Sequence, residues 1–183
     1  MKRFLFISIF SILTLACTGA QQRTSQAAAE LSFSFTRLSG SASNQFAVWV
    51  EDSQGRYMKT LYATRYTATG GWKRRETSIP VWVKKSGLAN LTNSQIDAVT
   101  GATPRTGELT YTWDGTDLNG TAVPSGDYFL ILEGTLRWEN QVLYRAPIRF
   151  GRGAAAAEVS VEYTGEAGND RNMIKDVKAR TLR

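Results

Sequence analysis

Residues 108–133 read ELTYTWDGTDLNGTAVPSGDYFLILE, and this stretch decides the fold. Its beginning alternates between apolar and polar side chains, and its end is dense in apolar residues, as β-strands are. The middle is rich in Gly, Asp, Asn and Pro, which supply the backbone conformations of turns. We predict that Trp113 to Tyr128 forms a β-hairpin, and that the rings of Trp113 and Tyr128 lie inside a two-sheet sandwich.

Strand patterns continue on both sides of this stretch. The predicted strands are 31–35, 45–51, 56–64, 108–113, 127–133, 141–150 and 157–163. They are short and separated by turn residues, which is typical of an all-β antiparallel sandwich. Residues 45–51 and 56–64 are expected to form a hairpin. Residues 79–85 (IPVWVKK) fit either a strand or a turn or two of helix, since Pro80 suits a first helical turn.

The composition outside these strands sets the expected limits of the domain. The sandwich should span residues 31–164. Residues 21–30 (QQRTSQAAAE) are polar and alanine-rich, and they predict a tether. Residues 165–183 are polar and mixed in charge, and they predict a frayed C-terminal tail.

The N-terminus has the pattern of a secretory signal peptide over residues 1–20. A short basic start precedes the apolar run Phe4–Leu15, which is too short to span a membrane as a mature helix. Thr18-Gly19-Ala20 predicts cleavage after Ala20, and lipidation of Cys17, which would anchor the chain to the membrane, is the alternative. Both predict a periplasmic protein, and export removes nucleic acid as a partner despite the net charge of +6.

The residue types that are missing exclude several kinds of site. The chain has 183 residues, no histidine, and Cys17 as its one cysteine. A Ser-His-Asp or Cys-His nucleophile, a zinc site of the usual Cys/His kind and a histidine-ligated haem are therefore excluded. An intrachain disulfide is excluded as well. Redox chemistry or catalysis would need a borrowed cofactor or carboxylates.

The string Asp97-Ala98-Val99-Thr100-Gly101-Ala102-Thr103 resembles D-x-x-[S/T]-G-A-T, the acceptor motif of bacterial flavin transferases. The resemblance implies that a transferase moves FMN from FAD onto Thr103. We expect the motif to lie on a long loop, where Gly101 and Ala102 leave the approach free of side chains and glycine allows unusual backbone conformations. Asp97 and Thr100 are expected to fix the loop through local hydrogen bonds to the backbone.

Two further resemblances concern the whole domain. Residues 113–128 are similar to the W-D-G hairpin of immunoglobulin-like domains in secreted bacterial proteins, which implies an immunoglobulin-like sandwich. Residues 44–151 resemble a family of predicted periplasmic proteins, domain-of-unknown-function family 2271, through QFAVWVEDSQGRYMKTLYATRYTATGGWKRR, IPVWV, DAVTGATP and the W-D-G segment. That family implies an envelope protein in the company of flavin transferases and membrane-bound iron-reductase-like proteins.

Aromatic and basic side chains near the motif are candidates for flavin contacts. Trp72 and Trp82 flank a glycine-rich break and precede the motif, so either ring could stack on the isoalloxazine; aromatic residues on such strands also serve simply as core. Arg65 and the basic run 73–75 could hold the FMN phosphate, or they could form an ordinary solvated face.

Two functions of different classes follow from the sequence. The first is an electron-transfer protein that carries covalent FMN on Thr103 and works with a membrane-bound redox protein. The second is a non-enzymatic sandwich module for binding or scaffolding, without a cofactor. A glycosidase-like carboxylate pair among Asp114, Asp117 and Glu133 is a weaker hypothesis, because nothing brings these residues together. A calcium loop at Asp114, Asp117 and Asn119 fails on ligand spacing.

Overall fold

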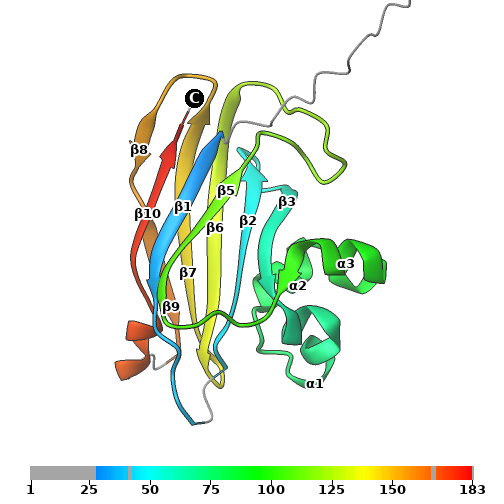
Figure 1. Cartoon of the computed structure of the whole chain (residues 1–183), viewed down its shortest axis with the longest axis vertical. Helices are drawn as coiled ribbons and strands as arrows, with labels where there is room; N and C mark the ends of the chain where they lie inside the picture. The colour runs from blue at the N-terminus through cyan, green and yellow to red at the C-terminus, as the bar shows by residue number, and fades with distance from the viewer. Residues whose placement is uncertain (1–27, 41–42, 166–167, 183) are drawn as a thin grey trace, which may run out of the picture.

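The computed structural model describes residues 28–40, 43–165 and 168–182, and these residues form two β-sheets packed face to face, with short helices on one side (Figure 1). The strands are β1 (Ala29–Phe35), β2 (Gln45–Asp52), β3 (Tyr57–Thr64), β4 (Thr100–Gly101), β5 (Gly107–Trp113), β6 (Gly126–Arg137), β7 (Asn140–Phe150), β8 (Ala155–Ala157), β9 (Ser160–Thr164) and β10 (Ile174–Thr181). The helical segments are η1 (Thr67–Gly71), α1 (Trp72–Arg74), α2 (Pro80–Lys85), η2 (Leu88–Asn90), α3 (Asn93–Val99) and η3 (Gly168–Met173). The predicted all-β sandwich is confirmed.

The strands of the described residues are ordered β5-β1-β10-β8 in the first sheet and β4-β3-β2-β6-β7-β9 in the second. Neighbouring strands run antiparallel, except that β4 runs parallel to β3. The hairpin predicted for 45–51 and 56–64 is the β2–β3 pair. The other nearest-neighbour hairpin in the second sheet joins β6 to β7 through the turn at Trp138 and Glu139.

Alternating side chains of both sheets fill the space between them. Phe33 and Phe35 from β1 meet Phe46 from β2 with ring centroids 5.4 and 5.3 Å apart. All three rings are buried. Full burial of such a side chain stabilises a fold by about 1.5–3 kcal/mol. The strict alternation in β1 therefore reports directly on this core.

The segment from Trp113 to Tyr128 is not a hairpin. Trp113 ends β5, which pairs with β1, whereas Tyr128 lies in β6, which pairs with β2 and β7 in the opposite sheet. The segment therefore connects the two sheets, and its local turn is closed by the bridge between Thr116 and Ala122. The prediction for the two rings holds, since both are buried and their centroids lie 5.0 Å apart.

The predicted frayed tail is wrong. β10 lies between β1 and β8, and its side chains Ile174 and Ala179 belong to the core between the sheets. The predicted N-terminal boundary of the domain at residue 31 is also too late. Ala28 and Ala29 are fully buried and belong to the sandwich rather than to a tether. The predicted signal peptide, its cleavage site, Cys17 and residues 21–27 lie outside the described residues.

The single strand predicted for 157–163 is two strands in different sheets. β8 pairs with β10 in the first sheet, and β9 pairs with β7 in the second. Val159 lies where the chain passes from one sheet to the other, and it packs against the core between them. This passage joins the two layers at one edge of the sandwich.

Part of the outer face of the second sheet is covered by the helices between β3 and β5, which lie at the β3 side of the molecule (Figure 1). Trp82 and Ile79 from this layer are fully buried against Trp49 and Ile131 from the sheet. The helical alternative for residues 79–85 is the correct one, with Pro80 at the first helical turn of α2. The molecule thus has a second core, outside the sandwich.

The carboxylate of Glu133 fixes the start of α2 on the sheet. Its two oxygens accept hydrogen bonds from the backbone amides of Val81 and Trp82, at 3.0 and 2.7 Å. The side chain is almost completely buried. Burial raises the pKa of Glu133 to about 7, although the two amides favour the ionised form and lower it.

The raised pKa of Glu133 should make stability fall as pH rises. Between about pH 4.5 and 7 the unfolded chain has released this proton while the folded chain still holds it, so rising pH favours unfolding. We expect Glu133 to remove about 3 kcal/mol of unfolding free energy across this window. Urea titrations at several pH values should show this slope in the wild type and not in Glu133→Gln. Equal slopes for the two proteins would contradict the prediction.

Candidate functional site

The D-x-x-T-G-A-T motif is part of regular structure, which corrects its predicted place on a long loop. Asp97 lies in α3, whose N-terminus is closed by a capping box between Thr92 and Gln95. Thr100 and Gly101 then form β4, which pairs with the end of β3. Only the last part of the motif leaves regular structure, so Thr103 follows directly after a fixed edge of the sheet.

Gly101 is needed for close packing rather than for an unusual backbone conformation. Its φ angle is not positive. A Cβ atom added here would lie 2.7 Å from Cε2 of Tyr62, closer than carbon atoms approach without displacement. The hydroxyl of Tyr62 donates to the carbonyl oxygen of Ala102 at 2.6 Å. Burial also raises the pKa of Tyr62 above its ordinary value.

The local hydrogen bonds predicted for Asp97 and Thr100 are not what the structure contains. Asp97 is exposed and forms an ion pair of 3.6 Å with Arg65. The hydroxyl of Thr100 is buried without a hydrogen-bond partner among the described residues. The motif is therefore held by strand pairing with β3 and by Tyr62, a residue forty positions earlier.

Thr103 lies at a shallow depression of about 560 Å³. The depression is lined by Arg37, Leu38, Gly40, Ser43, Asn44, Gln45, Tyr66, Arg75 and Thr103. Its wall near β1 is held in place because the backbone amide of Arg37 donates to the hydroxyl of Thr106 at 2.9 Å. Asn44 closes the same wall by accepting from the amide of Leu38 and donating to its carbonyl. The side chains of Arg37 and Arg75 and the exposed ring of Tyr66 thus line the same depression as Thr103.

The structure separates the other predicted site residues from Thr103. Trp72 and Asp97 line a different depression of about 450 Å³, where Lys73 lies 5.3 Å from the centre of the Trp72 ring. Trp82 is fully buried, and its indole nitrogen donates to the hydroxyl of Thr60 at 2.9 Å. Because no part of the Trp82 ring reaches the surface, its predicted stacking on a flavin does not hold.

The motif alone does not identify Arg37, Tyr66 and Arg75, which line the depression with Thr103, or Trp138, which contacts Arg75. Trp138 is 58% exposed, and its carbonyl accepts a hydrogen bond of 3.1 Å from Arg75. The guanidinium carbon of Arg75 lies 5.6 Å from the centre of the Trp138 ring. The sequence shows Tyr66, Arg75 and Trp138 only as individual aromatic or basic residues. Their association depends on the β6–β7 turn reaching α1, which no sequence pattern reports.

The acidic residues of the weaker hypothesis are not brought together. Asp114 forms an ion pair of 3.1 Å with Lys59. Asp117 accepts from the amides of Asn119 and Thr121 within its own turn. Glu133 lies under α2, on the outer face of the second sheet. The described residues contain no group of three or more acidic, histidine or cysteine side chains that could hold a metal.

Comparison with known proteins defines the family. A family model described as "Predicted periplasmic protein (DUF2271)" matches residues 28–169 of the 183. No curated protein and no solved structure matches the chain. No helix of the described residues is long and apolar enough to cross a membrane. The matched residues include the motif, the helical layer and most of both sheets. The chain belongs to the DUF2271 family of predicted periplasmic proteins.

Proposed function

We propose that this protein is an exported electron-transfer flavoprotein that carries FMN covalently on Thr103. The observation that supports the proposal most is the position of Thr103. It lies directly after a fixed sheet edge, at a depression that also holds Arg37 and Arg75. A flavin transferase would load the cofactor, and a membrane-bound redox protein would exchange electrons with it. Export by the signal at residues 1–20, with cleavage after Ala20 or lipidation of Cys17, is part of this proposal.

The residues around Thr103 fit the chemistry of a phosphodiester. A tethered FMN carries a negative phosphate next to the threonine oxygen, and Arg37 and Arg75 supply positive charge in the same depression. Gly101 and the exposed Ala102 precede Thr103, so no large side chain blocks the approach of a transferase from that side. Tyr62 holds the carbonyl of Ala102 and so fixes the backbone next to the acceptor.

The attachment step requires little of this chain. The hydroxyl of Thr103 attacks the FMN phosphorus of FAD; the new Thr Oγ–P bond forms as the pyrophosphate bond breaks, and AMP leaves. A threonine hydroxyl is a poor nucleophile, so a base must take its proton. The described residues that line the depression include no histidine and no carboxylate, so this base belongs to the transferase. The transferase also supplies the metal that polarises the pyrophosphate. Once attached, FMN supplies two-electron redox chemistry.

A borrowed cofactor is consistent with the residue types of the chain. Histidine is absent and Cys17 is the one cysteine, so the usual protein ligands for haem, copper and iron–sulfur centres are missing. Electron transfer by this chain therefore depends on an organic cofactor. The alternative function, a periplasmic binding or scaffold module without a cofactor, predicts that Thr103 stays unmodified.

Thr103→Ala should abolish flavin attachment. In cells that also express a flavin transferase, the wild-type peptide containing Thr103 should gain the mass of FMN less one water, and the purified protein should be yellow. Thr103→Ala should show neither change. Thr110→Ala, an exposed threonine in β5, is the matched control and should be modified like the wild type.

Two results would contradict the proposed function. One is an unmodified wild-type peptide from folded, exported protein in cells with an active transferase. The other is a flavin that remains covalently attached in Thr103→Ala. The first result would leave the binding or scaffold module as the function to pursue.

A further inference from the structure

We propose that Trp138 and Arg75 form a docking surface for the isoalloxazine ring of the flavin on Thr103. The proposal rests on the proposed function and adds a place for the ring. Arg75 belongs to the basic run 73–75 that the sequence offers for the FMN phosphate, whereas the aromatic residues that the sequence favours are Trp72 and Trp82.

Trp138 has a backbone conformation that tryptophan rarely adopts. Its φ angle is +53°, in the left-handed region that favours glycine or asparagine. It occupies the turn between β6 and β7, where glycine would fit without strain. A bulky residue in such a strained conformation points to a functional role for its side chain.

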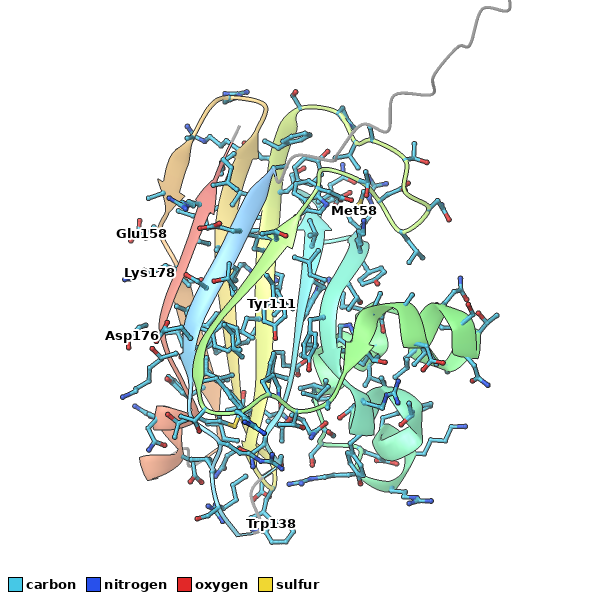
Figure 2. All side chains as sticks on the ribbon, in the orientation of Figure 1. Met58, Tyr111, Trp138, Glu158, Asp176 and Lys178 are labelled. Carbon is cyan, nitrogen blue, oxygen red and sulfur yellow. The ribbon has the colours of Figure 1, made fainter. Side chains whose placement is uncertain are left out.

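The ring of Trp138 has no role in the core. It is 58% exposed, the largest exposed fraction among the exposed large apolar side chains of the described residues. Figure 2 shows Trp138 at the lower end of the molecule, directed away from the sheets. A large aromatic ring that is both exposed and strained is characteristic of a binding surface rather than of a folding contact.

Arg75 connects this ring to Thr103. Its guanidinium donates to the carbonyl of Trp138 at 3.1 Å and lies 5.6 Å from the centre of the ring. The same side chain lines the depression that contains Thr103 and Arg37. Arg75 therefore links Trp138 to the depression that contains Thr103. A flexible ribityl phosphate arm fixed at Thr103 can place its ring along this path.

The three side chains match three parts of tethered FMN. Arg37, at the wall of the depression, attracts the phosphate. Trp138 offers a flat aromatic face for stacking. Arg75 stabilises the negative charge that develops on the flavin when it is reduced, which raises the reduction potential. Tyr66, 48% exposed, lines the same depression and gives a second aromatic wall.

Trp138→Gly separates ring docking from folding. Glycine accepts the positive φ of this turn, so the urea unfolding midpoint should not decrease. In protein loaded by a co-expressed flavin transferase, we expect wild-type flavin fluorescence to be quenched by the indole. Trp138→Gly should raise the fluorescence several-fold and increase its quenching by iodide. Trp72→Ala, which alters the other depression, should leave both unchanged.

Arg75→Gln tests the charge on the same loaded protein. Loss of the guanidinium should lower the flavin midpoint potential, whereas Arg74→Gln, at the preceding residue but outside the depression, should leave it unchanged. The Thr103 peptide mass keeps the two proposals apart. An unmodified peptide refutes the proposed function and this inference together. Modified protein in which Trp138→Gly and Arg75→Gln behave like the wild type, or in which Trp72→Ala raises the fluorescence instead, overturns this inference alone.

Discussion

Removal of residues 168–183 should leave a chain without a cooperative unfolding transition. The deletion takes away β10, which lies between β1 and β8 in its sheet. β8 has β10 as its one strand partner among the described residues, so it would be left unpaired. Met173, Ile174 and Ala179 would leave the core. Burial of a large apolar side chain stabilises the fold by about 1.5–3 kcal/mol. The total free energy of unfolding of a domain is only about 5–15 kcal/mol.

Urea and thermal unfolding followed by circular dichroism test this expectation. Lys178→Ala is the matched control, because Lys178 belongs to β10 but points away from the sandwich (Figure 2). It should unfold within about 0.5 kcal/mol of the wild type, as surface substitutions usually do. A truncated chain that keeps a sharp transition near the wild-type midpoint would show that β10 is dispensable.

Trp113→Ala should cost about 3–5 kcal/mol of unfolding free energy. The ring is fully buried, with centroids 5.0 Å from Tyr128 and 5.4 Å from Phe150. Its indole nitrogen also donates to the carbonyl of Thr116 at 2.8 Å, which fixes the connection between the sheets. Alanine would leave a cavity and an unpaired carbonyl.

The control for Trp113→Ala is the preceding residue. Thr112 lies in the same strand with an exposed side chain, so Thr112→Ala should change the unfolding free energy by less than about 1 kcal/mol. A cost below about 1 kcal/mol for Trp113→Ala in a urea titration would mean that the ring is not the centre of this part of the core.

The strand content could be predicted because alternation reports on one-sided burial. In residues 31–35 each apolar residue is buried and each serine is half-buried, as the pattern indicates. Pairing partners could not be predicted in the same way. The turn residues between Trp113 and Tyr128 permit a hairpin or a connection between sheets, since either needs a reversal of direction. The choice depends on β1 pairing with β5, a contact between distant residues.

β10 was missed because a bulge breaks its alternation. Residues 174–181 read IKDVKART, and the buried positions Ile174 and Ala179 are an odd number of residues apart. The register with β1 shifts at this point, and Asp176 has a φ of +54°. Beyond the bulge, Val177, Ala179 and Thr181 do alternate with charged residues. That shorter pattern was the available signal.

For the site, the motif singles out Thr103 but says nothing of its surroundings. Thr103 is identified by its neighbours in sequence. The depression around it includes Arg37, which follows β1, and Tyr66 and Arg75 from the helical layer, and Arg75 also contacts the turn at Trp138. These segments meet because β1, β6 and the helices end at one side of the sandwich. Its place between the glycine-rich break and the motif made Trp82 a candidate flavin contact. Because its ring is fully buried, it cannot stack on a flavin.

The path of β1 also separates the point where the described chain enters the domain from the depression at Thr103. The described chain enters β1 at the upper end in Figure 1, and the strand ends at the lower end, before the segment with Arg37. The strand between them has seven residues, which span about 20 Å at 3.3 Å per residue. If Cys17 is lipidated, its anchor joins the domain at the end of β1 opposite the segment with Arg37, which lines the depression at Thr103.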